Sequence, residues 1–316
     1  IKYSDNNIDS IIKSLSFLCI PMSLLENYIE IRKAILSKKI IRPKYIFSSS
    51  GLQKNIEFKI LFNEWRKMKT KLLYHQHGGN YGLDFFHSIE DYEIQNSDIF
   101  YYWGLCGNKK NYLQVPYRKI IKNHKIKNLF VMVDYPKNIH RIHYQPMGTK
   151  VQHLFNESKT FINQFTVSNN LFVRPYRIDY GWGFKELSKI KNCIIDKEKS
   201  SYKSITNSSL IICNYLGTIW LESIYLNIPT ICFYDDEVYK FRNESTQILD
   251  NLHKVGILHK SAISASKKAI EVNHKPNDWW NSEEVSEAIK IFKLNYTNLS
   301  NNWIKNWKNE FNRILE

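Results

Sequence analysis

The sequence of 316 residues lacks a long apolar run. No stretch reaches the roughly 18 apolar residues that suggest a membrane-spanning helix, and the most apolar early segment, Leu15 to Leu25, is short and contains Pro21. The chain starts at Ile1 rather than methionine and shows no signal-peptide pattern. We therefore expect a soluble or peripheral protein and a sequence that begins inside a longer chain.

Cysteine is scarce, which argues against a disulfide framework. The number of cysteines is odd, their spacings are wide, and several lie inside apolar runs typical of strands. Buried free thiols in a reducing cytoplasm fit this pattern best. The cysteines are Cys19, Cys106, Cys193, Cys213 and Cys232.

Acidic residues are also under-represented, at 30 against 45 Lys and Arg, which gives a net charge of +15. Such an excess favours nucleic acid, anionic lipid or sugar-nucleotide phosphates, or is simply a solvated surface. Aromatic residues do not interleave with Lys and Arg as in a recognised nucleic-acid module, so we do not expect that partner. An anionic membrane surface suits the basic charge and the Trp-bearing carboxyl-terminal helix.

The chain is 43% hydrophobic and 14% aromatic, and its length suits two domains. From Pro43 onward, short apolar runs alternate with longer amphipathic stretches, which predicts an α/β fold with parallel sheets. A linker near residues 115–128 divides two strand-helix sets, so two doubly wound domains should face a cleft, with ligands at the carboxyl ends of strands. The predicted strands are 43–47, 71–75, 99–103, 129–133, 171–174, 193–195, 210–213 and 230–233; the predicted helices are 53–68, 155–165, 220–226, 283–296 and 301–315.

A glycine-rich loop, His77-Gly-Gly-Asn-Tyr-Gly82, follows the predicted strand 71–75. Glycines let the backbone approach a ligand and expose N–H groups to an anion, although a sharp turn would also use them. His77 could act as a general acid or base. His75 shares its strand face, but no third ligand is near, so we expect no metal.

Acidic residues cluster after this loop at Glu90, Asp91, Glu93 and Asp98. Carboxylates beside an anion-binding loop could deprotonate an acceptor hydroxyl or form a covalent glycosyl intermediate. Helix capping is the competing interpretation, above all for Asp98. A second group, residues 235–237, is interpreted as a solvated loop rather than a metal site.

The second half of the chain has its own candidates for anion binding. Arg174 and Arg177 follow a predicted strand, and their planar donor forks suit phosphate, unless they form a surface salt bridge with Asp179. A helix start near Thr218 could hold a pyrophosphate on its N–H groups, and Glu222 could accept from ribose hydroxyls. His140 and His143 are interpreted as structural, and Trp279-Trp280 as aromatic core.

Together these segments resemble a bacterial family of surface-carbohydrate transferases with a Gln-His-Gly-Gly-x-Tyr-Gly motif, here Gln76 to Gly82. The similarity spans most of the chain. It implies a GT-B type glycosyltransferase of two Rossmann-like domains that needs no cofactor, with the first domain truncated at its amino terminus. The expected domains are 1–125 for acceptor and catalysis, 126–290 for the nucleotide sugar, and 291–316 as helices that cross back.

The expected function is transfer of a sugar from a nucleotide donor to a glycan or lipid-linked acceptor at the cytoplasmic face of the membrane. The loop and helix start are similar to those of transferases that use CMP-activated acidic sugars such as Kdo. A polyol-phosphate transferase, a sugar-nucleotide epimerase and a basic nucleic-acid- or membrane-binding protein remain alternatives. The expected site residues are His77, Glu90, Glu93 and Asp98 for catalysis; Gln76, Gly78, Gly79, Asn80 and Tyr81 for substrate; and Arg174, Arg177, Asn214, Gly217, Thr218 and Glu222 for the donor.

Overall fold

A computed structural model describes residues 8–16, 18, 20–105, 127–136, 148–298, 300 and 302–316. The chain divides into two compact units, Ile1–Leu73 and Tyr74–Glu316. The predicted boundary at residue 125 lies outside the described residues and stays a prediction, as do the arrangement around a cleft and the roles of His140 and His143. Cys19 and Cys106 also lie outside them.

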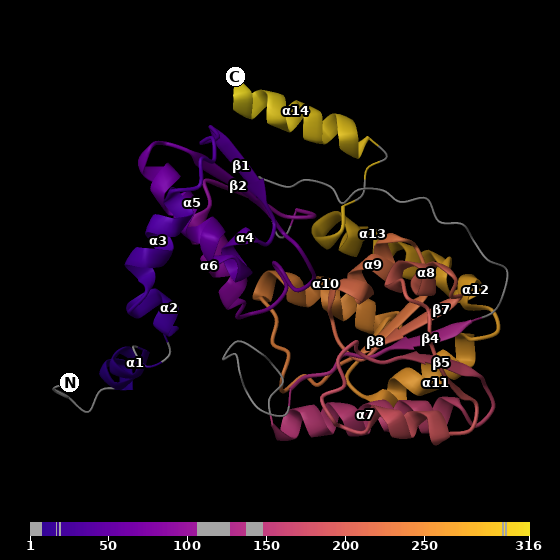
Figure 1. Cartoon of the computed structure of the whole chain (residues 1–316). Coiled ribbons are helices and arrows are strands. Elements are labelled where there is room, and N and C mark those ends of the chain that lie inside the picture. The colour runs from indigo at the N-terminus through magenta and orange to yellow at the C-terminus, as the bar shows by residue number, and fades with distance from the viewer. Residues whose placement is uncertain are drawn as a thin grey trace. The chain divides into compact units, whose positions relative to one another are not determined.

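The first unit is mainly helical and has a small core of its own (Figure 1). Ile35 of one helix packs with Ile60 and Leu61 of another. The predicted helix 53–68 is present as two helices separated at Asn55, whose side chain accepts from Phe58 N and so begins the second helix. The elements are α1 (Ile8–Ser16), α2 (Met22–Leu25), α3 (Tyr28–Leu36), β1 (Tyr45–Ser48), α4 (Gly51–Lys54), α5 (Ile56–Lys67) and the start of β2 (Lys71–His75).

A three-stranded sheet has the order β1-β2-β3, and the division between the units falls inside β2. Helix α6 (Ser88–Asn96) precedes β3 (Ile99–Tyr101). Gln76 N, just after β2, donates to Tyr101 O at the end of β3, so the carboxyl ends of these strands lie together. The candidate loop 77–82 begins at this edge.

The second unit contains a six-stranded parallel sheet in the order β6-β5-β4-β7-β8-β9. The α/β class with a parallel sheet is therefore confirmed, and so are the predicted strands of this half. Because the chain runs outward from β4 on one side and from β7 on the other, the topological switch point lies between β4 and β7. The strands are β4 (Asn128–Val131), β5 (Leu171–Arg174), β6 (Cys193–Ile195), β7 (Leu210–Cys213), β8 (Thr230–Phe233) and β9 (Leu258–His259).

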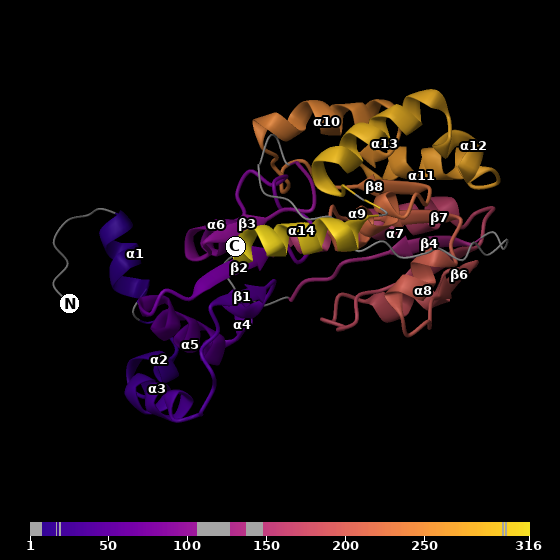
Figure 2. The same cartoon turned by 90° about the horizontal axis from the view of Figure 1, so that it is seen from above.

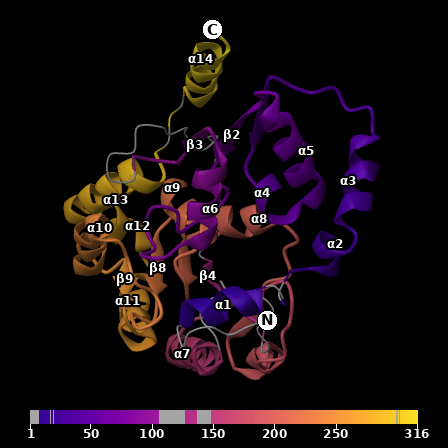
Figure 3. The same cartoon turned by 90° about the vertical axis from the view of Figure 1, so that its left-hand side faces the viewer.

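Helices cover both faces of this sheet, which explains its near-continuous apolar strands. Helices α7 (Thr149–Phe165) and α11 (Ala262–Val272) lie side by side on one face (Figures 1 and 3). Phe161 of α7 packs against Phe130 and Phe233 of the strands. The other face carries α9 (Thr218–Tyr225), while α10 (Asn243–Lys254) and α13 (Glu283–Tyr296) lie side by side (Figure 2). The remaining helices are α8 (Ser201–Thr206), α12 (Pro276–Trp280), α14 (Trp303–Leu315) and a 3-10 helix at Phe184–Lys189.

Three cysteines of the sheet, Cys193, Cys213 and Cys232, are buried free thiols, as predicted. Burial raises the pKa of each, which keeps the thiols protonated. Trp280 is 1% exposed and Trp279 packs against the core, so the prediction of aromatic core is confirmed. None of the helices within the described residues combines the length and apolarity needed to cross a bilayer.

Candidate active site

His77 lies directly after β2 and leads a chain of hydrogen bonds into the protein. Its Nδ1 is 2.6 Å from the hydroxyl of Tyr81, and that hydroxyl donates to Glu93 Oε2 at 2.7 Å. Tyr81 is 2% exposed and Glu93 is fully buried on α6, whereas 35% of the His77 side chain is exposed. The hydrogen-bonded series therefore begins at the partly exposed imidazole of His77 and ends at the buried carboxyl of Glu93.

The direction of these bonds assigns the histidine tautomer. A phenol has one proton, and because Tyr81 gives it to Glu93, Nδ1 of His77 donates to the phenol oxygen. The neutral ring then keeps its lone pair on Nε2. Burial, followed by the charge of Glu93, raises the pKa of Tyr81, so the phenol keeps its proton. In its neutral form, His77 would therefore carry at Nε2 the lone pair that a general base requires.

Two of the three glycines of the loop, Gly78 and Gly79, allow it to pack tightly against the start of α9. Gly79 N donates to Thr218 Oγ1 at 3.1 Å. A Cβ on Gly79 would lie 2.7 Å from the carbonyl carbon of Gly217, and one on Gly78 would lie 2.9 Å from Thr218 Oγ1. The structure therefore brings together the two segments that the sequence singled out. This close packing accounts for both glycines without a bound phosphate.

Gln76 has a buried position that fixes the shape of the loop. Its Nε2 donates to Gly78 O at 2.7 Å, and its Oε1 accepts from Trp103 N at 3.0 Å. The predicted substrate contacts Gln76 and Tyr81 are both 2% exposed, so they orient neighbouring groups within the protein. His75 packs against Trp307, with ring centroids 5.4 Å apart.

Asn80 and Asp84 present acceptor oxygens that the described residues do not satisfy. Oδ1 of each is buried and has no hydrogen-bond donor there, and Asn80 has the left-handed φ of 74°. Burial raises the pKa of Asp84 to about 7, although the hydrogen bond from the side chain of Asn80 acts in the opposite direction and lowers it. Sequence reasoning missed Asp84; its position two residues after the motif was the available signal.

Glu90 is fully buried and already bound by four donors. Arg242 approaches it with both terminal nitrogens, at 3.0 and 2.9 Å, Tyr102 donates at 2.7 Å, and Gly82 N donates at 3.0 Å. The predicted catalytic carboxyl therefore holds the loop to the start of α10. Arg242 was missed, because nothing in its local sequence points to a partner 152 residues away.

Asp98, also predicted as catalytic, is exposed and precedes β3. Gln76 pairs with the opposite end of that strand. Three residues of strand span about 10 Å. The structure therefore does not bring Asp98 to His77.

The switch point between β4 and β7 is bridged by Asn214. This side chain is 1% exposed; its Oδ1 accepts from Val133 N at 2.9 Å and its Nδ2 donates to Ser158 at 3.0 Å. The predicted donor contact Asn214 is thus occupied within the fold. Gly217, just before α9, has no room for a side chain, since a Cβ would lie 1.8 Å from the ring of Tyr215. Half-buried Glu222 lies one turn into α9.

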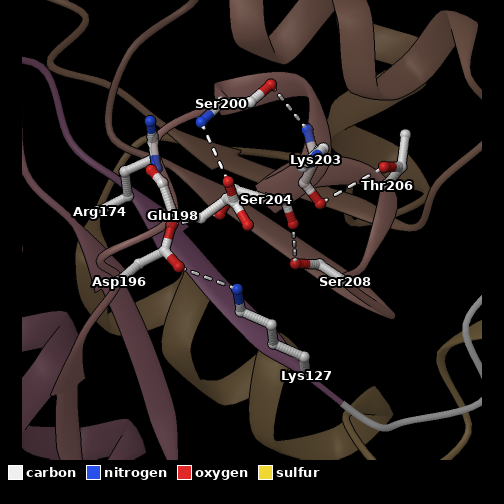
Figure 4. Close-up of polar contacts among 9 residues, drawn as sticks. All are labelled: Lys127, Arg174, Asp196, Glu198, Ser200, Lys203, Ser204, Thr206 and Ser208. Carbon is white, nitrogen blue, oxygen red and sulfur yellow. Dashed lines mark hydrogen bonds and ion pairs between the residues drawn. The ribbon is translucent and has the colours of Figure 1, made fainter.

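Arg174 belongs to a polar cluster beside α8 (Figure 4). Its Nη1 donates to Asp196 Oδ2 at 2.9 Å and to Glu198 O at 2.7 Å. Burial would raise the pKa of Asp196, but hydrogen bonds from Ser204, Arg174 and Lys127 hold it below its ordinary value. The suggested pair with Asp179 is not formed by Arg174, because Arg174 pairs with Asp196. Arg177 is exposed.

Aromatic residues gather near the carboxyl ends of the six-stranded sheet. Trp182 Nε1 donates to Tyr135 O at 2.7 Å, the hydroxyls of Tyr135 and Tyr239 are 3.3 Å apart, and Tyr176 stacks on Tyr180. Sequence reasoning did not assemble this cluster, because its members come from three different loops.

The acidic residues 235–237 line a cavity of about 450 Å³ that α7 and Lys260 complete. Lys150 pairs with Asp235 and Glu237, and Lys260 pairs with Asp236 at 3.1 Å. Within the described part of the chain, no three His, Cys, Asp or Glu side chains are grouped as metal ligands.

Comparisons with known proteins identify a family. Residues 2–311 match the model of the family described as LIC12162 family transferase. Among curated proteins there is no significant match. A solved structure of the wall teichoic acid polymerase TagF is similar, with 10% identity, 85% of this chain and 71% of that chain covered, and a TM-score of 0.44.

Proposed function

Because the chain belongs to the LIC12162 family of transferases, we propose that it moves a sugar from a nucleotide-activated donor to a hydroxyl group of a surface glycan or lipid-linked acceptor. The observation that carries the proposal is the partly exposed side chain of His77, which contacts the hydroxyl of Tyr81 and, through it, buried Glu93. Such an arrangement suits the removal of a proton from a hydroxyl. The same proposal includes a GT-B fold of two Rossmann-like domains, with the expected bounds 1–125 and 126–290, and a location in the cytoplasm.

In the proposed reaction, Nε2 of His77 takes the proton of the acceptor hydroxyl as its oxygen attacks the anomeric carbon of the donor. The bond between that carbon and the donor phosphate breaks, and the nucleotide leaves with the electron pair. The imidazolium is stabilised by Glu93 through the hydroxyl of Tyr81. Tyr81 and Glu93 are positioning residues here, because they act through His77.

The leaving phosphate is proposed to lie near the start of α9, where the helix dipole and free N–H groups favour negative charge. In this proposal, exposed Tyr176 supplies a stacking surface for the base, and Glu222 supplies an acceptor for the ribose hydroxyls. Exposed Arg177 is the arginine available to the phosphates, and this basic protein suits an acidic sugar carried on CMP.

The test begins with a thermal-shift screen of CMP-, CDP-, UDP- and GDP-linked sugars, because a ligand of the folded state raises the melting temperature. Nucleotide release from each stabilising donor is then measured, and the product is analysed. His77→Ala should lower turnover about 10²- to 10⁴-fold while donor binding remains.

Exposed His274 provides the matched control, and His274→Ala should leave turnover unchanged. Full turnover by His77→Ala would refute the assignment of the base. A phosphodiester in the product would show that the enzyme transfers a polyol phosphate rather than a sugar. A free epimer of the sugar nucleotide would show that it is an epimerase.

A further inference from the structure

Two segments of the first unit form a single basic surface near the amino ends of β1 and β2. Residues 37–44 contact residues 66–71 through Arg42, which donates to Met68 O at 2.8 Å, and through Lys71 N, which donates to Lys44 O at 3.1 Å. These two segments, named the basic surface below, contain eight basic residues and no acidic one. The basic residues are Lys38, Lys39, Arg42, Lys44, Arg66, Lys67, Lys69 and Lys71.

Most of this charge is not neutralised within the fold. Lys38 pairs with Glu57 at 2.7 Å, and Lys67 pairs with Glu64 at 3.0 Å. Both glutamates lie outside the two segments of the basic surface. For Lys39, Lys69 and Lys71, the described residues include no acidic partner. All eight cations are on exposed residues, so the surface carries a strong local positive potential.

Exposed apolar side chains lie among these cations. Ile41 is 92% exposed, the highest value among the large apolar residues described, and Ile40 and Met68 are 45% and 52% exposed. Full burial of an isoleucine side chain contributes about 1.5–3 kcal/mol of favourable free energy. Because Ile41 is almost fully exposed, the fold alone does not gain this contribution. Exposed apolar side chains that alternate with cations along the same two segments suit a surface that is both anionic and apolar.

We propose that the basic surface docks on an anionic lipid bilayer, with Ile40 and Ile41 entering the headgroup region and the lysines facing lipid phosphates. Each lysine near such a surface contributes about 1 kcal/mol. Nucleic acid would neutralise the cations but leave the isoleucines in water. Helix α14 is a weaker candidate, because its Trp307 packs on His75 and its Glu310 binds Tyr101.

The test is sedimentation of the full chain with vesicles of phosphatidylglycerol and phosphatidylethanolamine, compared with phosphatidylcholine vesicles. Wild type should bind only the anionic vesicles, and less at 1 M salt, where the Debye length falls to about 3 Å. Ile40→Ser with Ile41→Ser should weaken binding about tenfold or more. Lys39→Glu with Lys69→Glu should abolish it at 0.15 M salt.

Ile263→Ser with Lys267→Glu is the matched control, because both residues are exposed on α11 of the second unit. This control should bind as wild type does. Melting curves of all variants verify folding. The proposal fails if wild type does not sediment with anionic vesicles, or if either double variant of the basic surface binds as well as wild type.

Binding to random oligonucleotides that needs the lysines but not the isoleucines, without vesicle binding, would assign the surface to nucleic acid instead. The docking proposal and the proposed reaction fail separately. Nucleotide release from a soluble donor should persist in Ile40→Ser with Ile41→Ser, whereas His77→Ala should lose it and still sediment.

Discussion

Asp84 carries a buried carboxyl whose ionisation should weaken the fold at neutral pH. Its pKa is raised from 3.8 to about 7, first by burial. A carboxyl whose folded pKa exceeds its unfolded pKa favours the folded state fully below pH 4, and this contribution is lost as pH rises to 7. Asp84→Asn is neutral at every pH and should not show the loss.

The gap between these two pKa values corresponds to about 4 kcal/mol, an upper bound because the carboxyl can relax toward solvent. The unfolding free energy of Asp84→Asn should therefore match that of wild type near pH 4 and exceed it progressively up to pH 7. Above pH 7 the difference should become constant. The same variant should lose turnover, since stabilising a strained site commonly costs activity.

Urea unfolding followed by tryptophan fluorescence at pH 4.5, 6, 7 and 8 measures the difference. Exposed Asp98→Asn is the matched control and should follow wild type at each pH. The reasoning would be refuted if the unfolding free energies of wild type and Asp84→Asn changed with pH in parallel. Lower stability of Asp84→Asn at pH 8 would also refute it.

Three further outcomes follow from particular contacts. Arg242→Met leaves Glu90 buried without its cation and should lower the unfolding free energy by about 3–5 kcal/mol in urea, whereas adding Glu90→Gln should restore part of it. Gly79→Ala would push the loop away from α9 and should lower the unfolding free energy in urea by about 1–3 kcal/mol. An unchanged unfolding free energy would show that this close contact is absent. Cys213 and Cys232 should resist iodoacetamide in the native protein and react after unfolding; fast native labelling would contradict their burial.

The parallel sheet could be predicted because its strands are short apolar runs between amphipathic helices. The two-residue strand β9 was missed, since Leu258 and His259 form no pattern. Helix α6 was missed for a different reason: its buried residues are Glu90 and Glu93. A search for apolar periodicity cannot find a helix whose inner face is acidic, so the sequence showed an acidic cluster where the fold has a helix.

Roles within the site depended on partners that are distant in sequence. The motif identified His77 and its loop, but whether a carboxyl acts on substrate or holds the fold depends on what contacts it. Glu93 reaches Tyr81 and supports His77, while Glu90 binds Arg242. The two acids are three residues apart on one helix, so local sequence could not separate them.

The loop that carries His77 is held in place by the same half of the chain that is proposed to bind the donor. Thr218 accepts from Gly79 N, and Ser245 donates to Gly82 O. Because Thr218 opens α9, a phosphate at that helix start would lie beside the hydrogen bond that positions the loop. If the donor binds as proposed, its binding should be coupled to the orientation of His77 through Thr218, and Thr218→Val, which removes the hydroxyl that accepts from Gly79 N, should disturb both.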